Sequence, residues 1–349
     1  MLLKQLVLTN FRNFALKTID VNPSLTLIVG KNSLGKTNLL EAIYFFVNGV
    51  GFREIKEEEL LSFGRSEALV EGTLLFDKEG DFDCAVKISM VNNRVSKRFF
   101  INKTEKKHTQ YIDEQIKSIL FSPEQINIII GSPQLRRDYF NKTISIFDRE
   151  YKKRLINYDA ALRKRNKVLE LRIPTDKLKE ELKFWDEYLI NQGSYLTKKR
   201  QAYVDFLNNN QSLDSKSFSI HYLKNEISKL RLEENFTEAL RFKKTLIGPQ
   251  KDDFQIYINS PDGKKNVHHF GSRSEQRLAV FWLKMNEIRY FEKYFLSKPI
   301  ILLDDIFSEL DQNNQKIIIP LISQYQTVAT TTEESLIDLI KLKKSVIRL

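Results

Sequence analysis

The sequence is poor in the residues that build disulfide frameworks and zinc sites. Its 349 residues include one cysteine, Cys84, and four histidines. One cysteine cannot form an internal disulfide or a cysteine-rich zinc site, and it suits a reducing compartment. The histidines, His108, His221, His268 and His269, lack the spacing of zinc ligands, and no Ser-His-Asp or Cys-His set is evident. Catalysis by a histidine-based metal centre or triad is therefore not expected.

Long apolar runs are also missing. None approaches the ~20 residues needed to cross a bilayer, and the first residues, MLLKQLVLTNF, alternate like a strand instead of resembling a signal peptide. We therefore expect no membrane partner and a cytoplasmic location. With 42% hydrophobic and 29% charged residues, the chain is typical of folded globular proteins, and its length favours two lobes or domains.

Acidic residues are too few to balance the basic ones. The chain has 56 Lys and Arg against 45 Asp and Glu, a formal charge of +11, which favours a polyanionic partner. Between residues 135 and 172 there are 12 basic and five acidic residues. A solvated helix face usually alternates in sign, and this segment does not, so nucleic-acid contact is favoured. The candidate DNA-binding residues are Arg136, Arg137, Lys152, Lys153, Arg154, Arg163, Lys164 and Arg165.

A phosphate-binding loop is the firmest motif. Residues 30–37, GKNSLGKT, fit G-x-x-x-x-G-K-[ST] without a mismatch, after the apolar strand 25–29 and before a helical apolar pattern. Backbone N–H groups of such a loop and the following helix N-terminus bind a triphosphate. Lys36 would neutralise the β- and γ-phosphates and Thr37 would hold Mg²⁺. The predicted ATP-binding residues here are Gly30, Lys31, Asn32, Ser33, Leu34, Gly35, Lys36, Thr37 and Asn38.

Two carboxylates follow a second buried strand. The sequence PIILLDD ends in Asp304 and Asp305, and carboxylates at a strand end complete a Mg²⁺-nucleotide site in a chain with a phosphate loop. Asp304 would hold the metal through water. Asp305 would orient or deprotonate the attacking water. The alternative, two solvated acids at a strand end, is disfavoured beside Lys36.

The order of elements predicts a split α/β lobe. Strands are expected at 2–8, 25–29, 68–76, 83–90 and 98–101, and again at 254–258, 300–303 and 327–329, because apolar alternation or short apolar runs end at turn residues. Between these two groups of strands, helical periodicity predicts two long antiparallel helices joined by a turn at Pro174, followed by a further helix at 236–242. We predict an ATPase lobe of residues 1–120 and 243–349 and a helical lobe of residues 121–242.

The motifs in this order resemble the RecF family of ABC-type, SMC-like ATPase heads. The resemblance covers nearly the whole chain and includes NFRNF at 10–14, GKNSLGKTNLLEAIY, GFR at 51–53, FSPE at 121–124, GSP at 131–133 with Arg136-Arg137, RN at 165–166, WDE at 185–187, GP at 248–249 with Asp252-Asp253, GSRSEQR at 271–277 and PIILLDDIFSELD. It implies a fold of the α/β class, a split phosphate-loop lobe with a β-rich subdomain plus an inserted helical lobe with short antiparallel helices.

The resemblance also implies further site residues. Arg12 and Asn13 lie where such heads contact the nucleotide, and Glu124 or Gln125 is implied as a metal-site residue in the loop that couples the site to the helical lobe. The signature segment, with Ser272, Arg273 and Ser274, would reach the γ-phosphate of ATP bound to a second copy. Residues 308–311, including Asp311, would face the partner across the same interface, and residues 330–331 would occupy the sensor position.

The signature departs from the family pattern. RecF-like and other ABC signatures usually carry Ser-x-Gly-Gln, whereas this chain has Ser272-Arg273-Ser274-Glu275. A carboxylate facing a γ-phosphate would repel it. Ser272-x-x-Glu275 is also a capping box, which would turn Glu275 back to its own helix and leave Arg273 to contact the phosphate.

The function implied by the resemblance is an ATP-driven DNA clamp. The expected partners are single- and double-stranded DNA, an ATP-dependent homodimer and recombination mediator proteins; the expected cofactors are ATP and Mg²⁺. Hydrolysis, weak and DNA-stimulated, would reset the clamp during recombinational repair and replication-gap maintenance. Two alternatives remain open: an SMC-like structural DNA tether, although only about one hundred residues separate the head halves, and the ATPase subunit of a DNA-processing nuclease, although only 38 residues follow Asp311.

Overall fold

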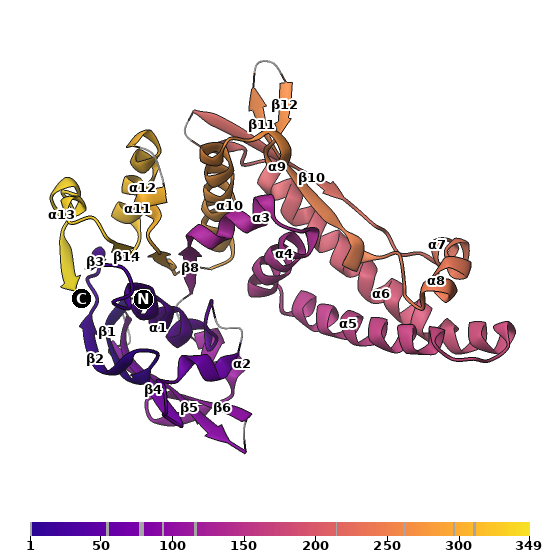
Figure 1. Cartoon of the computed structure of the whole chain (residues 1–349), viewed down its shortest axis with the longest axis horizontal. Coiled ribbons are helices and arrows are strands. Elements are labelled where there is room, and N and C mark those ends of the chain that lie inside the picture. Colours follow the sequence, from indigo (N-terminus) through magenta and orange to yellow (C-terminus); the bar gives the residue numbers. More distant parts are fainter. Residues whose placement is uncertain are drawn as a thin grey trace. The chain divides into compact units, whose positions relative to one another are not determined.

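The computed structural model describes residues 2–53, 56–76, 80–92, 94–114, 117–213, 215–260, 263–295, 297–309 and 312–349. The chain forms two compact units, one of Met1–Glu124 with Glu287–Leu349 and the other of Gln125–Asn286. Figure 1 shows the elements of each unit coloured along the chain.

The first unit contains an antiparallel sheet in the order β2-β1-β4-β5-β6-β7. Its strands are β1 (Leu2–Phe11), β2 (Phe14–Asp20), β4 (Glu67–Phe76), β5 (Gly80–Val91), β6 (Arg94–Ile101) and β7 (Thr104–Lys106). In β5, Cys84, Val86 and Ile88 are buried and the residues between them are more exposed. This alternation is the pattern of a strand with one covered face.

A second sheet of this unit is parallel. Its order is β15-β3-β14-β13-β8, formed by β15 (Lys344–Arg348), β3 (Leu25–Val29), β14 (Thr327–Thr331), β13 (Ile300–Leu303) and β8 (Ser118–Phe121). Every residue of β3, β13 and β14 is buried, as expected for parallel strands covered on both faces. The carboxyl ends of parallel strands share one edge, so the loops that follow β3, β13, β14 and β8 are brought together there.

Helix α1 (Lys36–Asn48) packs against strands of both sheets. It is buried on nearly all sides, from Leu39 to Val47, because a helix between two sheets has no solvent-facing stripe. Its apolar side chains join those of both sheets in one core. The other helices of the unit are α2 (His108–Glu114), α11 (Ile306–Glu309), α12 (Gln312–Gln324) and α13 (Ser335–Leu339).

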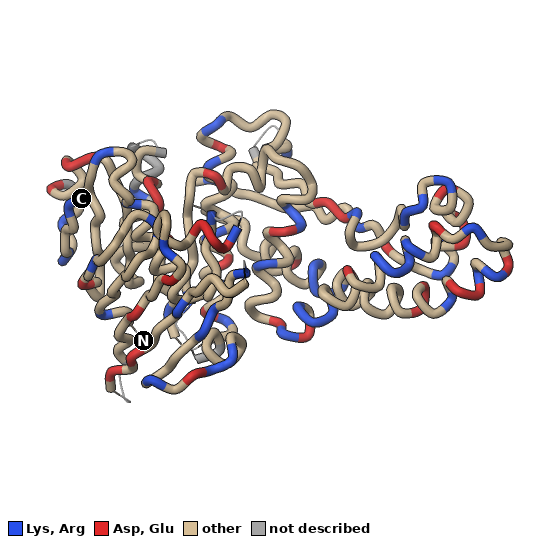
Figure 2. The backbone as a smooth tube through the Cα atoms, turned by 60° about the horizontal axis from the view of Figure 1, so that its bottom comes forward, with Lys and Arg blue, Asp and Glu red and all other residues tan. Residues whose placement is uncertain are grey.

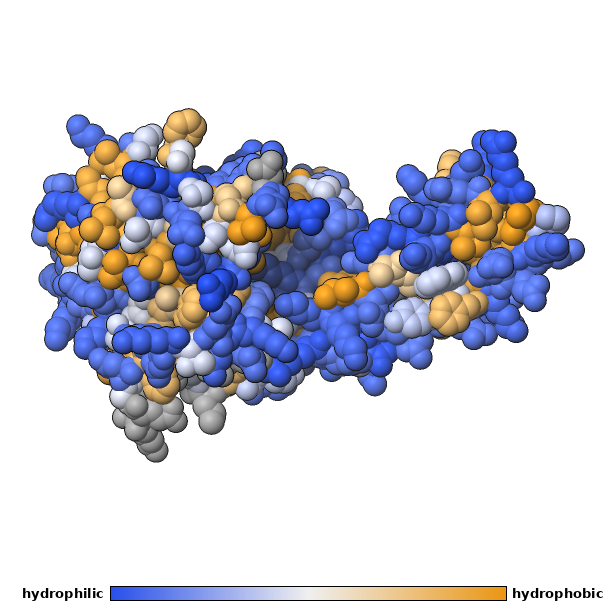
Figure 3. All heavy atoms as spheres, turned by 90° about the horizontal axis from the view of Figure 1, so that it is seen from below, coloured by the Kyte–Doolittle hydropathy of each residue, from blue (hydrophilic) through white to orange (hydrophobic). Residues whose placement is uncertain are grey.

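The second unit is built on a helical hairpin. Helices α5 (Arg149–Leu169) and α6 (Thr175–Asn208) pack along each other and, at 1.5 Å per residue, are about 30 and 50 Å long. Apolar side chains line their interface. Leu171, Ile173, Leu230 and Phe242 are exposed, and Figure 3 shows apolar groups gathered at the end of the hairpin, on a surface that is otherwise largely hydrophilic along the hairpin. The unit also contains α3 (Asn127–Ile130), α4 (Pro133–Phe147), α7 (Lys229–Glu234), α8 (Phe236–Phe242) and α9 (Val267–Phe270), and α10 (Arg273–Tyr294) begins in it.

The predicted second domain boundary is wrong. Residues 243–286 belong to the second unit, not to the ATPase lobe, because β11 (Asp253–Ser260) pairs antiparallel with β10 (Lys216–Leu223) from Ser217↔Asn259 to Leu223↔Asp253. With β9 (Ser212–Leu213) and β12 (Gly263–Asn266) they form a sheet in the order β12-β11-β10-β9. The inserted unit is therefore mixed, not purely helical, and the first boundary lies at 124/125 instead of 120/121.

Candidate functional site: a phosphate loop, a carboxylate pair and a signature turn

The phosphate loop connects β3 to α1. Ser33 and Gly35 have positive φ values of 68° and 101°, and a Cβ on Gly35 would lie 2.5 Å from Asn13 Nδ2. At position 35, the positive φ and the lack of room for a Cβ together require glycine. Helix α1 begins directly afterwards at Lys36, so its unpaired N–H groups face the position of an anion. Lys31, Asn32, Ser33 and Leu34 are exposed on the loop.

Lys36 folds back over this loop. Its Nζ donates to Gly30 O at 2.8 Å and to Lys31 O at 3.0 Å, and the residue is 8% exposed. The ammonium group thus lies inside the curl of the backbone, at the centre of the anion site. A phosphate entering this curl would replace neutral carbonyl partners with a charged one, which forms a stronger hydrogen bond.

Thr37 and Asp304 meet across the parallel sheet. Asp304 Oδ1 accepts hydrogen bonds from Thr37 Oγ1 at 3.0 Å and from Thr330 Oγ1 at 2.8 Å. Burial raises the pKa of the Asp304 carboxyl, and the two hydroxyl hydrogen bonds only partly oppose it. A hydroxyl and a buried carboxylate are the oxygen ligands that Mg²⁺ prefers, so these residues fit the metal that the sequence predicts. Among the described residues, no group of three or more His, Cys, Asp or Glu is arranged to hold a metal, so Mg²⁺ here would rely on one hydroxyl, one carboxylate and the phosphates of the nucleotide.

Asp305 has an unusual backbone and an unsatisfied side chain. Its φ is 50°, its backbone N–H donates to Thr330 Oγ1 at 2.9 Å, and its carbonyl accepts from Ser308 Oγ at 2.8 Å. Its Oδ1 is buried without a hydrogen-bond partner among the residues that the structure describes. Because an unpaired buried acceptor and a positive φ are both unfavourable, they mark Asp305 as a residue shaped for an incoming donor such as water.

Asp304→Asn is expected to make the nucleotide-free protein more stable. The pKa of the Asp304 carboxyl is higher in the folded than in the unfolded protein. The carboxyl therefore favours folding at pH values below its unfolded pKa, and this contribution is lost as the pH rises through its folded pKa. At pH 7 the buried carboxylate therefore opposes folding, and a neutral amide should raise the free energy of unfolding by roughly 1 kcal/mol. Urea denaturation without Mg²⁺ measures this, and the gain should vanish near pH 4. A loss of stability at pH 7 would contradict the assignment.

A polar network connects the β1–β2 turn to the loop. Glu41, fully buried, accepts from Arg12 Nε at 2.8 Å and from Arg53 Nη2 at 3.2 Å. Arg53 Nη2 also donates to Asn38 Oδ1 at 2.5 Å, and Asn38 Nδ2 donates to Asn13 Oδ1 at 2.7 Å. Asn13 Nδ2 reaches Leu34 O at 3.4 Å. The structure thus brings Arg12 and Asn13, which the resemblance implies as nucleotide contacts, close to the phosphate loop and to Asn38, and their contact with a nucleotide stays a prediction.

Three other predicted residues are placed less directly. Glu124 and Gln125 lie in a 3-10 turn, Pro123–Ile126, just after β8, and Asp304 N donates to Phe121 O at 2.9 Å. Glu124 is exposed, and metal binding by it or by Gln125 stays a prediction. Asp311 lies outside the described residues.

The signature turn begins α10 in the second unit. Glu275 N donates to Ser272 Oγ at 3.2 Å, and Ser272 N donates to Glu275 Oε2 at 2.7 Å. These two bonds are the capping box that the spacing predicts. Burial would raise the pKa of Glu275, but hydrogen bonds from Lys265 and Ser272 outweigh burial and lower it. Ser272 and Arg273 remain exposed, and Ser274 is partly exposed.

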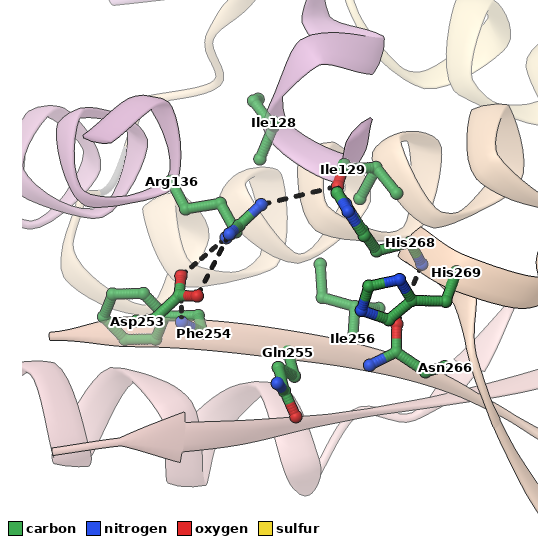
Figure 4. Close-up of a pocket in the computed structure, with 10 residues that line it drawn as sticks. All are labelled: Ile128, Ile129, Arg136, Asp253, Phe254, Gln255, Ile256, Asn266, His268 and His269. Atoms are coloured by element: carbon green, nitrogen blue, oxygen red, sulfur yellow. Dashed lines mark hydrogen bonds and ion pairs between the residues drawn. The ribbon is translucent and has the colours of Figure 1, made fainter. Parts of the chain in front are cut away.

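Figure 4 shows what anchors the segment before the signature. A cavity is lined by residues of α3, α4, β11 and α9, among them Ile128, Arg136, Asp253 and His268. His268 Nδ1–H donates to Ile129 O at 2.6 Å, and Arg136 pairs with Asp253 at 2.7 Å. The signature segment is therefore tied to α3, which directly follows Glu124 and Gln125 in the chain.

Comparisons with known proteins agree with this geometry. A family model described as RecF/RecN/SMC N terminal domain matches residues 2–342. The DNA replication and repair protein RecF of Thermoanaerobacter sp. (strain X514) is 32% identical over 350 residues, which cover 95% of this chain and 94% of the relative. RecF of Clostridioides difficile (strain 630) is 31% identical over 356 residues, with 96% and 92% coverage. This chain belongs to the RecF family.

Solved structures place the RecF-family chain in the same fold. The structure of the recombination mediator protein RecF-ATP in the RecFOR pathway superposes with a TM-score of 0.83 at 30% identity, covering 95% of this chain and 92% of that one. An Smc head domain from Pyrococcus furiosus gives a TM-score of 0.56 at 17% identity over 96% and 91% of the chains, a likeness of fold alone. The predicted ABC-type ATPase head of the α/β class is confirmed. No described helix is long and apolar enough to cross a membrane.

Two of the eight predicted DNA contacts need correction. Arg165 is 1% exposed and pairs with Asp186 at 2.5 Å, and Arg136 is 8% exposed and held by Asp253. A buried guanidinium group that is already paired with a carboxylate inside its own unit is not available to phosphates. Arg137 donates to Asp252 O, and Arg154 donates to Glu150 and Asn191. The exposed candidates on α5 are Lys152, Lys153, Arg163 and Lys164.

Arg53 and Glu41 are site residues for which sequence reasoning assigned no role. Glu41 holds both arginines that flank the phosphate loop, and Arg53 Nε is buried without a partner among the described residues. Two sequence signals point to these residues: Glu41 interrupts the apolar run that extends from Leu39 to Val47, and Arg53 belongs to the GFR motif of the family pattern.

Proposed function

We propose that this RecF-family chain is an ATP-dependent DNA-binding protein of recombinational repair and replication-gap maintenance. In this proposal it binds single- and double-stranded DNA as an ATP-driven homodimer and assists recombinase loading together with mediator proteins. The observation that carries the proposal is the hydrogen bond from Thr37 to Asp304 next to Lys36 of the phosphate loop, with Asp305 tied through its N–H to Thr330, which also donates to Asp304. This set would supply metal binding, charge neutralisation and water activation for an ATP γ-phosphate.

The site residues of the first unit have separate roles in the proposed switch. Lys36 would bind the β- and γ-phosphates, and Thr37 and Asp304 would hold Mg²⁺, which would neutralise the charge of the phosphates. Asp305 orients the attacking water with its unpaired Oδ1. Arg12 and Asn13, fixed by Glu41 and Asn38, contact the nucleotide from the β1–β2 turn.

Dimerisation would complete the site. The proposal places Ser272, Arg273 and Ser274 of one copy on the γ-phosphate bound by the other, so that ATP joins two copies and hydrolysis releases them. Arg273 is exposed, and a guanidinium is well suited to phosphate oxygens. An interface formed twice by a two-fold axis doubles every such contact.

Helix α5 is the proposed DNA-binding element. Lys152 and Arg163, and likewise Lys153 and Lys164, are eleven residues apart, so each pair projects from the same helix face about 16 Å apart. Figure 2 shows basic positions recurring along the hairpin. Such contacts with phosphates are sequence-independent and strongly dependent on salt.

Replacing Lys152, Lys153, Arg163 and Lys164 with alanine is expected to weaken DNA binding at least tenfold at 0.1 M salt and to reduce the slope of log K against log salt by about three. Fluorescence anisotropy with gapped duplex DNA, with and without Mg-ATP, measures both quantities. A variant in which the exposed residues Lys177, Lys183, Lys198 and Lys229 are replaced has the same charge change and serves as the control. Equal losses in the two variants would contradict α5 as the DNA site.

The alternative functions differ in their outcomes. A structural tether of the SMC type would bind DNA equally well with the four α5 residues replaced, because its contacts would lie elsewhere. The ATPase subunit of a nuclease would cleave DNA only with a second protein. ATP-dependent binding of gapped DNA by this chain alone favours the proposed clamp over both.

A further inference from the structure

The signature turn is held by a lysine from a neighbouring hairpin. Lys265 lies in β12, opposite Ile258 of β11, and its Nζ donates to both carboxylate oxygens of Glu275, at 2.9 Å to Oε1 and 2.8 Å to Oε2. The side chains are 39% and 20% exposed. With Ser272 N on Oε2, both oxygens of Glu275 are engaged inside its own unit.

Glu275 occupies a position where a free carboxylate would be harmful to the proposed clamp. In a dimer whose signature faces the γ-phosphate of the partner, a carboxylate three residues after Ser272 would add a negative charge beside a triphosphate. Like charges within several ångströms repel strongly at the intermediate dielectric of a protein surface, and like-charge contacts at interfaces are costly.

We propose that Lys265 is a positioning residue of the signature: it neutralises Glu275 and holds the carboxylate against the N-terminus of α10. Ser272, Arg273 and Ser274 are then presented to the phosphate without an opposing charge. The inference rests on the proposed ATP-dependent dimer and assigns that dimer a residue that lies outside the signature itself.

The geometry separates this role from simple stabilisation. A partly exposed ion pair contributes little to the stability of a fold, and the capping box can form without Lys265. Loss of the lysine should therefore leave the unit folded while freeing a charge at the interface. The weaker dimerisation caused by loss of Lys265 must disappear when Glu275 is replaced by a neutral residue. If Lys265 only stabilised the fold, replacing Glu275 would not restore dimerisation.

A double-mutant cycle tests the inference. The dimer dissociation constant is measured by sedimentation at saturating Mg-ATP for wild type, Lys265→Ala, Glu275→Gln and the double variant, with Lys264→Ala as the control from the same hairpin. We expect Lys265→Ala to weaken dimerisation about tenfold or more. Glu275→Gln and the double variant should both stay within about twofold of wild type, as should the control. ATP affinity of the monomer and the melting temperature should change little in all variants.

The outcomes distinguish the inference from the function on which it rests. Suppose that wild type dimerises with ATP. If Lys265→Ala then dimerises as tightly as wild type, or if it weakens dimerisation equally with and without Glu275→Gln, the role of Lys265 is overturned and the proposed clamp is retained. Wild type that remains monomeric at saturating ATP overturns the proposed clamp and the inference together. A large fall in the melting temperature of Lys265→Ala that Glu275→Gln does not restore assigns the lysine to folding and overturns the inference alone.

Discussion

Lys36→Ala is expected to lower the affinity for ATP about a hundredfold or more. The ammonium group of Lys36 lies within the phosphate loop, 2.8 and 3.0 Å from the carbonyl oxygens of Gly30 and Lys31. Alanine removes a charge-assisted bond to the triphosphate, and about 3 kcal/mol corresponds to a hundredfold change in the dissociation constant. Isothermal titration calorimetry with Mg-ATP measures the loss.

The fold should survive this substitution. Lys36 Nζ donates to carbonyls of the loop and to no other acceptor among the described residues, and alanine is a good residue for the first turn of a helix. Lys56→Ala removes an exposed lysine of the same unit and should leave ATP affinity unchanged. Nucleotide binding by Lys36→Ala within about threefold of wild type would contradict the phosphate-loop assignment.

Asp305→Asn is expected to reduce ATP hydrolysis by about a hundredfold while ATP binding persists, because removing a general base typically costs 10² to 10⁴ in rate. Asparagine has the same shape and tolerates the φ of 50° that Asp305 adopts, so the loop should keep its conformation. Phosphate release in single-turnover experiments measures the rate, and calorimetry measures binding.

A second consequence concerns the lifetime of the clamp. If hydrolysis separates the two copies, the Asp305→Asn dimer should persist on DNA long after wild type has dissociated. Glu333→Gln, an exposed acid beyond β14, controls for loss of a negative charge in the unit. Hydrolysis at the wild-type rate in Asp305→Asn would remove Asp305 from the mechanism.

Local patterns predicted the strands and turns around the phosphate loop. The strands 25–29 and 300–303 were predicted with the bounds that β3 and β13 have, because buried parallel strands are short apolar runs flanked by turn residues. Thr37 and Asp304 meet as expected, since the carboxyl ends of β3 and β13 lie at the same edge of the parallel sheet, with β14 between them. The capping box at Ser272 and Glu275 was likewise readable from a spacing of three.

Features that depend on distant pairing were not predictable. The boundary at 242/243 failed because β11 pairs with β10, from Leu223↔Asp253 to Ser217↔Asn259, and single-sequence periodicity carries no information on partners so far apart in the chain. Charge counting could not show that Arg136 and Arg165 are buried against Asp253 and Asp186. The contact of Lys265 with Glu275 depends on the register of a hairpin, which the sequence alone left open.

The most direct test of the account is the mass of the protein in solution with and without Mg-ATP. Sedimentation equilibrium should give one 41.1-kDa chain without nucleotide and two chains with Mg-ATP, and Lys36→Ala should stay at one chain under both conditions. A wild-type mass that does not change with saturating Mg-ATP would contradict the ATP-driven clamp.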